Sequence, residues 1–339
     1  MTQSIADQIS REFTDFLNDY HSQPEVFDDE LDAQIHRWYA DYLTDRKRKI
    51  FPPRGIPYFS PSSADDDPRA LYEKIRGAKR EQSKSQPNQG RQVRIGTAIG
   101  DVIQRDILFA EKHYADKRFS FTRNDYGEPV FEDFAKVSKI VEHNGKKFAL
   151  YGTADGIMRY VSEDGESLRV GLEVKSKQST YAKTSPYSMR NGAEDKHVKQ
   201  CVCYSMMYDV DYYIVLYVNG ARKSWFMSDE EFEKNPDIMA FGLYITDDMR
   251  EEILDHFADI VRMADEGDAP NTDLERWTFN SFKQRIATSL TDEEVDELRR
   301  QEIRMSRSRL PDWQKAKITQ AFEELKTLRE AASPNDTEN

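Results

Sequence analysis

Two neighbouring segments of alternating apolar and polar residues, YGTADGIMRY (151–160) and RVGLEVKSK (169–177), constrain the fold of this chain most strongly. Each is typical of a short β-strand, and the Asp-Gly pair between them predicts the tight connection of a hairpin. Because side chains alternate between the two faces of a strand, Glu173 and Lys175 are expected to point the same way, with Val174 turned into the core. The hairpin therefore predicts an acid and a base side by side on one face of a sheet.

Asp155 adds a second carboxylate, because the neighbouring strand should place it opposite Glu173. Two carboxylate oxygens suit Mg²⁺ or Mn²⁺, which otherwise keeps waters and takes phosphate oxygens. We expect Asp155, Glu173 and the carbonyl of Val174 to hold the cation, and Lys175 to orient the attacking water or stabilise the charged phosphate. The alternative is a surface salt bridge between Glu173 and Lys175 on a two-stranded ribbon.

The segment GAEDKHVKQCVCYSMMYD (192–209) has apolar residues at helical spacing, which predicts a helix after the hairpin. Lys196, Gln200 and Tyr204 recur at intervals of one helical turn and line one face of it. D-x(17)-E-x-K followed by Q-x-x-x-Y resembles the PD-(D/E)XK nuclease superfamily, in particular its RecB-like and phage exonuclease members. The resemblance implies an α/β core, a central mixed β-sheet flanked by helices, and places Gln200 and Tyr204 in the active site, where they position the DNA backbone. The alternative interpretation is that Tyr204 is a core aromatic and Gln200 a rim residue.

The stretch 95–114 resembles a helix that carries a metal-approaching histidine in RecB-like nucleases. Gln104 stands in the place of that histidine, and we expect it to bind a phosphate of the DNA or a water on the metal. Glu111 lies two turns further along the same face, where the resemblance to phage members of the family implies a carboxylate that joins the metal site. His113 is expected at the surface, and His197 near phosphate or solvent.

Segment 57–77, PYFSPSSADDDPRALYEKIRG, resembles the part of iron–sulphur members of the family that supplies one cysteine of their cluster. Asp67 occupies the place of that cysteine here. Phe279 and Phe282, within 269–287, fall where two C-terminal cysteines would lie. We therefore expect no iron–sulphur cluster, and a contact between the two ends of the chain that consists of apolar packing.

The net charge of −13 argues against a uniformly basic surface, but DNA binding requires only a local basic patch. The two cysteines, Cys201 and Cys203, are too few for an iron–sulphur cluster or a Cys₄ zinc site and fit a reducing cytosol. No apolar run reaches membrane-spanning length and the N-terminus has no signal-peptide core, so nothing argues for export. The resemblance to phage and RecB-like nucleases implies the cytoplasm of a bacterium or of a phage-infected host. The residues expected to contact DNA are Gln104, Lys177, Lys183, Arg190, Lys196 and Lys199.

The pattern of elements predicts one nuclease domain with helical additions. We expect strands near 130–142 and 147–160, a polar loop over 80–92 and a substrate-facing loop over 176–193. The expected parts are a helical N-terminal extension (1–53), the nuclease core (54–226), a helical C-terminal region packing on that core (227–330) and a disordered tail (331–339).

The predicted function is a metal-dependent DNA exonuclease of phage-type or RecB-like recombination, repair or replication. DNA is the expected partner, with a recombination or single-strand-binding protein as a candidate second partner. No nucleotide cofactor is expected, since the chain has no G-x-x-x-x-G-K-[ST] motif. Three alternatives stay open: an endonuclease of the same fold, a catalytically silent DNA-binding or scaffold protein, and an acidic helical interaction protein with a chance E-x-K. The oligomeric state is also open.

Overall fold

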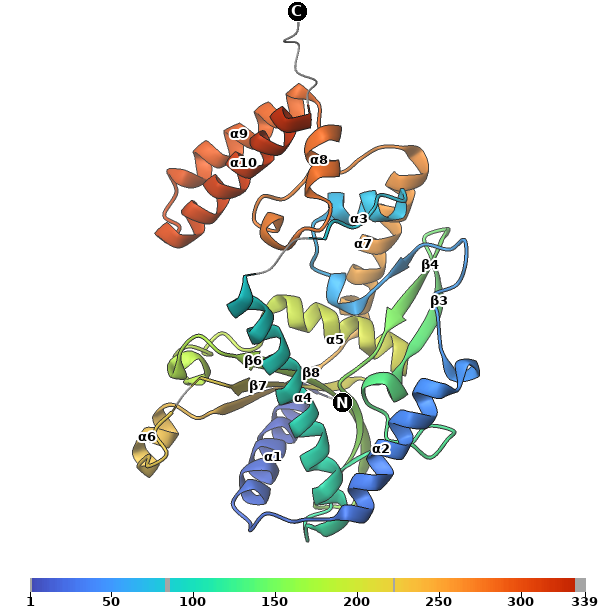
Figure 1. Cartoon of the computed structure of the whole chain (residues 1–339), viewed down its shortest axis with the longest axis vertical. Coiled ribbons are helices and arrows are strands. Elements are labelled where there is room, and N and C mark those ends of the chain that lie inside the picture. The colour runs from blue at the N-terminus through green and yellow to red at the C-terminus, as the bar shows by residue number, and fades with distance from the viewer. Residues whose placement is uncertain (1, 83–85, 222, 333–339) are drawn as a thin grey trace, which may run out of the picture.

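The computed structural model describes residues 2–82, 86–221 and 223–332, in which five strands form a central sheet (Figure 1). Their order is β2-β5-β6-β7-β8, with β6 and β7 parallel and the other neighbours antiparallel. The expected α/β class, a mixed sheet flanked by helices, is therefore confirmed. The strands are β2 (Phe119–Phe121), β5 (Gly156–Val161), β6 (Ser167–Lys177), β7 (Tyr212–Asn219) and β8 (Ile238–Tyr244).

The chain changes sheets just before the hairpin. Strands β1 (Tyr58–Phe59), β3 (Val137–His143) and β4 (Lys146–Gly152) form a second, three-stranded sheet in the described residues. β5 and β6 form the expected antiparallel hairpin, with Gly156 opposite Leu172. The single strand expected over 147–160 is wrong, because the chain leaves one sheet after Gly152 and joins the other at Gly156. Asp155 consequently lies in the connection between two sheets.

Helices cover both faces of the central sheet. α1 (Gln3–His21), α2 (Asp29–Thr44) and α4 (Pro87–His113) share a buried apolar cluster with one face, where Leu172 and Leu216 point. α5 (Asp195–Tyr208) packs on the other face, where Val215 and Tyr217 point, and α7 (Asp247–Glu266) packs on α5 and on β4 of the second sheet. The helices expected at 1–53 are present, and α1 is one layer of the core itself.

Two stretches differ from the expected secondary structure. The region 227–330 was expected to be helical, yet β8 forms an edge of the central sheet after the short helix α6 (Asp229–Lys234). Of the loop expected over 80–92, residues 83–85 lie outside the described residues, and 87–92 are helical, because α4 begins at Pro87, where the missing N–H of proline costs no hydrogen bond. Of the expected tail, residues 331–332 belong to α10, and 333–339 lie outside the described residues.

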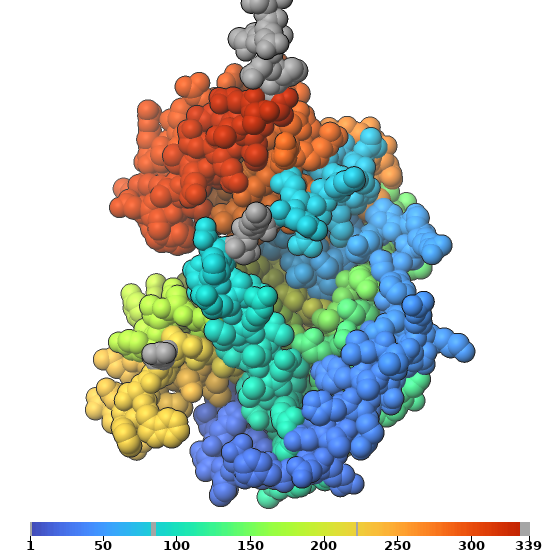
Figure 2. Space-filling model, in the orientation of Figure 1, coloured from blue at the N-terminus to red at the C-terminus, as the bar shows by residue number. Residues whose placement is uncertain are grey.

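The C-terminal helices form a lobe above the sheet with an apolar cluster of its own (Figure 1). In Figure 2 a hollow separates this lobe from the body that contains the central sheet. None of the helices in the described residues is long and apolar enough to cross a membrane. The lobe contains α8 (Lys283–Ser289), α9 (Asp292–Ser306) and α10 (Asp312–Ala332), and α3 (Pro68–Ile75) packs against it. The short 3₁₀ turns of the chain are η1 (Arg46–Arg48), η2 (Pro61–Ser63), η3 (Glu132–Ala135), η4 (Tyr181–Thr184) and η5 (Trp277–Phe279).

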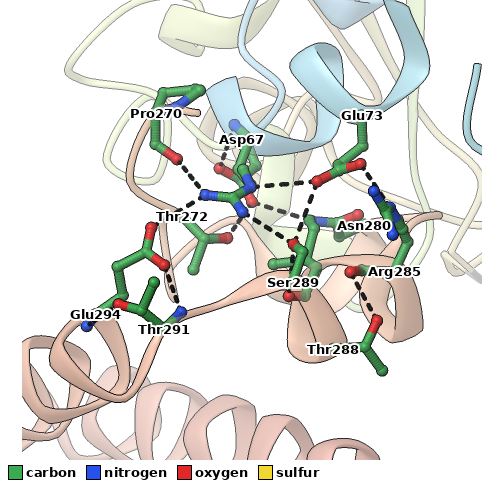
Figure 3. Close-up of polar contacts among 12 residues, drawn as sticks. Asp67, Glu73, Pro270, Thr272, Asn280, Arg285, Thr288, Ser289, Thr291 and Glu294 are labelled. Atoms are coloured by element: carbon green, nitrogen blue, oxygen red, sulfur yellow. Dashed lines mark hydrogen bonds and ion pairs between the residues drawn. The ribbon is translucent and has the colours of Figure 1, made fainter. Parts of the chain in front are cut away.

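The contact between α3 and the C-terminal lobe is polar at its centre, which corrects the expectation of apolar packing (Figure 3). The buried carboxylate of Asp67 accepts hydrogen bonds from the Thr272 hydroxyl, from the Asp273 N–H at 3.2 Å and from the Asn280 amide at 3.0 Å. An ionised carboxylate has room for about four such bonds, so polar donors replace apolar packing around it. Phe279 is 91% exposed and takes no part.

Arg69 forms the second half of this contact, and its guanidinium is also buried. It lies 3.3 Å from Glu73 on its own helix and 3.1 Å from Glu294 at the start of α9. It also donates to the Ser289 hydroxyl and the Pro270 carbonyl. We call this group, from Asp67 and Arg69 to Glu294, the polar lock. Phe282 is buried in the apolar cluster beside it.

Candidate active site

Asp155 lies in the connection between β4 and β5, outside any strand, and two hydrogen bonds from other elements hold it in place. Its carboxylate accepts a hydrogen bond of 2.7 Å from the N–H of Val174 in β6. Its carbonyl accepts one of 2.8 Å from the side-chain amide of Gln104 in α4. β5 has already left β6 at this point, so the main chain of Val174 is free to bind the Asp155 side chain. In an extended strand the N–H and C=O of one residue point to the same side, so the Val174 carbonyl also faces Asp155.

Glu173 and Lys175 lie on the same face of β6, as alternation predicts. The Glu173 side chain is buried and forms an ion pair with Lys175. Its second oxygen, Oε2, has no hydrogen-bond partner among the described residues. A buried carboxylate oxygen without a donor is rare, and a bound cation would satisfy it.

Lys175 connects the strand to helix α5. Its ammonium group donates to the Gln200 side-chain oxygen at 3.1 Å, and the Gln200 amide donates to the Tyr204 hydroxyl at 3.2 Å. Both Gln200 and Tyr204 are buried. The Q-x-x-x-Y face of the helix is thus turned toward β6, since residues four apart lie one above the other.

Burial and crowding disfavour the ionised form of the two carboxylates in the site, whereas the carboxylates favour the cationic form of Lys175. Burial and the nearby Glu173 raise the pKa of Asp155. Burial also raises the pKa of Glu173, although Lys175 works in the opposite direction. Burial disfavours the charged form of Lys175, but Glu173 and Asp155 outweigh this and raise its pKa. Lys175 is therefore held as a cation, while the two carboxylates lack enough positive charge.

Glu132 is a third carboxylate that the sequence analysis missed. The Gln104 amide, which binds the Asp155 carbonyl, also lies 3.3 Å from the Glu132 carboxylate. Burial, and then the charge of Asp155, raise the pKa of Glu132 to about 6. The only hint in the sequence is an acidic pair between two phenylalanines that prove to be buried, Phe131 and Phe134.

Glu111 does not join this group, which corrects the expected ligand set. Seven residues along α4 place it about 10 Å from Gln104 along the helix axis. Its Oε1 instead lies 2.6 Å from the guanidinium of Arg123, and its Oε2 has no hydrogen-bond partner among the described residues. His113 is exposed, as expected, and its ring forms a hydrogen bond with Asp28. His197, expected near phosphate or solvent, is buried and bonds the Tyr217 hydroxyl.

The expected DNA-binding cations fall into two groups. Three of them have acidic partners: Lys177 and Lys196 pair with Glu194, and Lys199 pairs with Asp65 and Asp195. Lys183 and Arg190 are exposed and have no acidic partner among the described residues. Gln104, also expected to contact DNA, is buried; its amide nitrogen binds Asp155 and Glu132, and its side-chain oxygen has no partner among the described residues. Cys201 and Cys203 are both free and buried.

The donor set fits a hard divalent cation. Within the described part of the chain, no group of three or more His, Cys, Asp or Glu side chains is arranged to hold a metal ion. A pair of carboxylates with a carbonyl is nevertheless what Mg²⁺ uses, because it keeps waters and substrate phosphates for its other positions. The unpartnered Oε2 of Glu173 and the raised pKa of Asp155 both indicate that a bound cation would stabilise the ionised carboxylates here.

The chain was compared with known proteins. No protein-family model matches the sequence, and no curated protein matches it. Its structure is similar to that of the protein SSO0001, with a TM-score of 0.40 and 14% identity over 76% of this chain and 98% of the other. It is similar to an alkaline exonuclease from Laribacter hongkongensis (TM-score 0.35, 9% identity, 68% and 93% covered), which has also been solved with dAMP. A phage-related exonuclease from Haemophilus somnus 129PT has a TM-score of 0.33 and 12% identity, with 60% and 81% covered. These likenesses are too distant to assign a function, which has to come from the geometry of this chain.

Proposed function

We propose that this protein is a metal-dependent deoxyribonuclease, and that it acts as an exonuclease. The observation that carries the proposal is the placement of Asp155 on the Val174 N–H beside Glu173, whose second oxygen has no partner in the described structure. Lys175, Gln200 and Tyr204 extend from it as one hydrogen-bonded chain. A structural ion pair between Glu173 and Lys175 would need neither the Asp155 carboxylate on the Val174 N–H nor the third carboxylate of Glu132.

Asp155, Glu173 and the carbonyl of Val174 would hold the cation, Mg²⁺ or Mn²⁺. When bound, such a cation supplies Lewis-acid activation of water and neutralises phosphate charge. Both carboxylates are buried, and the cation would offset their mutual repulsion.

Lys175 acts on the phosphate as a fixed positive charge. Its raised pKa keeps it protonated at neutral pH, so it donates hydrogen bonds and does not serve as a general base. The Gln200 oxygen accepts a hydrogen bond from the ammonium group and orients it, and Tyr204 in turn orients Gln200. A donor held in this way stabilises the charge that develops on a phosphate during hydrolysis.

Asp155→Ala and Lys175→Ala test this assignment. Each should lower Mg²⁺-dependent cleavage of DNA by about 10²-fold or more, the usual cost of removing a catalytic electrostatic group. Lys147→Ala is the control, because Lys147 pairs with Glu142 on an exposed strand. Normal cleavage by both site variants would show that the activity lies elsewhere.

Circular and linear plasmids distinguish the nuclease modes. An exonuclease needs an end, so it should degrade linear DNA in Mg²⁺ and leave closed circles intact. Nicking of circles would instead identify an endonuclease, and no metal-dependent loss of either substrate would identify a DNA-binding protein. DNA is thus the proposed partner; a recombination or single-strand-binding protein and a cytoplasmic location stay predictions.

A further inference from the structure

Two stretches beside the proposed site contain no acidic residue, in a chain whose net charge is −13. They are 86–100, which includes the N-terminal half of α4, and 176–193, which begins with the last two residues of β6 and continues into the loop after it. The five Lys and Arg residues in them are Arg91, Arg94, Lys177, Lys183 and Arg190.

The two stretches form one surface. The Gln178 amide donates to the Gln92 carbonyl at 2.9 Å, and a Cβ placed on Gly96 would lie 3.0 Å from the Ser176 hydroxyl. Figure 2 shows the N-terminal half of α4 and the segment after β6 next to each other, beside the hollow below the C-terminal lobe. We call this surface the basic rim. It begins about 7 Å from Lys175, two residues along the strand.

Tyr187 presents an aromatic ring on this rim. The side chain of Tyr187 is 77% exposed, and the Arg190 guanidinium lies over its ring at 4.6 Å from the centroid. Arg190 also donates to the Tyr187 carbonyl at 2.9 Å, so the pair is held as a unit. One face of the ring carries a cation, and a flat apolar partner can stack on the other.

The turn that carries Tyr187 is rigid. Thr184 is fully buried, donates to the Pro236 carbonyl and accepts from Asn219 at the end of β7. Met189, two residues after Tyr187, is buried in the core below α5. The Ser185 hydroxyl accepts the Ser188 N–H and closes the turn. An exposed ring on a fixed turn loses little entropy on binding, which favours a recognition role.

We propose that the basic rim binds unpaired, single-stranded DNA, with a base stacked on Tyr187 and phosphates along Lys183, Arg190 and Arg94. A duplex keeps the faces of its bases stacked on one another, so only an unpaired base can use the ring. Exposed aromatics within a basic track are the usual means of holding a single strand. The inference rests on the proposed nuclease function only in that the strand would lead to Lys175.

Binding measured in EDTA tests the rim without any cleavage. The probes are fluorescent oligothymidylate, an abasic oligomer of equal length and charge, and a blunt duplex. The wild type should bind oligothymidylate more tightly than either of the others. Tyr187→Ala should weaken oligothymidylate binding by about 5- to 150-fold, the range for loss of one stacked base, with little effect on the abasic oligomer. Tyr187→Phe should bind like the wild type.

The cations are tested by salt dependence. Lys183→Ala and Arg94→Ala should each reduce the slope of log K against log salt by about 0.7 on single strands. Phe27→Ala is the aromatic control, because Phe27 is 83% exposed and adjoins Asp28, which pairs with Lys112 at the opposite end of α4.

Equal binding of oligothymidylate by wild type and Tyr187→Ala would overturn the inference, as would a wild type that prefers the blunt duplex. Melting temperatures show whether each variant is folded, and the exposure of Tyr187 means that they should not change. The test separates the two proposals. Tyr187-dependent binding without cleavage in Mg²⁺ would support single-strand binding at the rim and reject the nuclease function. Cleavage without Tyr187-dependent binding would support the nuclease function and reject single-strand binding at the rim.

Discussion

Glu132 reaches the site from a backbone conformation that few residues of its kind adopt. Its φ is +46°, in the left-handed region, where a non-glycine residue costs about 1–3 kcal/mol unless its surroundings impose it. Here they do: the Glu132 N–H donates to the Ala154 carbonyl at 3.1 Å, and its carbonyl accepts from the Thr153 hydroxyl. The connection that presents Asp155 therefore also presents Glu132.

Glu132→Gln tests whether this third carboxylate serves the site. The substitution keeps the shape of the side chain and removes its charge. We expect cleavage to fall about 10- to 100-fold, with a higher Mg²⁺ requirement, the usual effect of changing a group that supports metal ligands. Glu111→Gln, near the C-terminal end of α4, is the matched control. It should cleave normally because Glu111 pairs with Arg123. The reverse result would return Glu111 to the metal site.

Sequence reasoning reached the residues whose position follows from one element. Alternation along a strand puts Glu173 beside Lys175, and helical spacing puts Gln200 above Tyr204, as the structure has them. Glu132 was out of reach because its position depends on two irregular connections that touch. No periodicity describes such a contact.

At the scale of elements, α1 is docked on the main chain of β8. The Gln3 amide donates to the Gly242 carbonyl at 2.7 Å and accepts the Tyr244 N–H at 3.1 Å. The side chain thus covers part of the open edge of the sheet, where unpaired main-chain groups would invite other strands. Sequence patterns missed β8 because IMAFGLY is a short apolar run between two stretches with helical spacing.

Gly242→Ala should be strongly destabilising, because the backbone of α1 lies directly against residue 242 of β8. A Cβ on residue 242 would lie 1.8 Å from the Ala6 carbonyl oxygen, which belongs to a helix backbone and has no free rotation. We expect a loss of about 3 kcal/mol or more in the free energy of unfolding, measured by urea denaturation. Gly100→Ala in α4 is the control: nothing lies within 4 Å of its Cβ, and alanine should stabilise the helix by about 0.5–1 kcal/mol. A similar effect of both changes would mean that α1 is not packed this closely.

At the scale of the whole molecule, the polar lock joins the C-terminal lobe to α3. Sequence reasoning paired the right regions, 57–77 with 269–287, but expected apolar packing. The partners of Asp67 are more than 200 residues away along the chain, so their chemistry is set by tertiary contact alone. The buried Glu73 depends on Arg69 and on Arg285, which lies 3.0 Å from it.

Arg69→Ala should loosen the lobe. It leaves the buried Glu73 with one cation in place of two, and breaking a buried pair in this way costs about 3–5 kcal/mol. Hydrogen exchange should then show that α8 to α10 lose protection before the central sheet does. Arg262→Ala removes an exposed pair within α7 and should cost less than about 1 kcal/mol. Uniform loss of protection over the whole chain would mean that the lobe and the sheet unfold as one unit.

Asp67 makes the stability of the lock depend on pH. Burial raises its pKa to about 6, although hydrogen bonds from the Thr272 hydroxyl and from the N–H groups of Arg69 and Asp273 work in the opposite direction. The unfolded chain binds this proton only below about pH 4, so the folded state gains stability from it below that value and loses it as the pH rises through about 6. The loss amounts to roughly 3 kcal/mol for two pKa units.

Urea unfolding of the wild type and Asp67→Asn across this range measures the effect. The free energy of unfolding of the wild type should fall more steeply between about pH 4 and pH 6 than that of Asp67→Asn, because an amide does not titrate. Asp164→Asn on the exposed hairpin loop is the control and should keep the wild-type slope. Glu132 and Asp66, whose pKa values are also raised by burial, are present in all three proteins, so the difference in slope belongs to Asp67. Equal slopes would mean that the donors around Asp67 keep its carboxylate ionised over this whole range. The stability of the lock would then not depend on the protonation of Asp67.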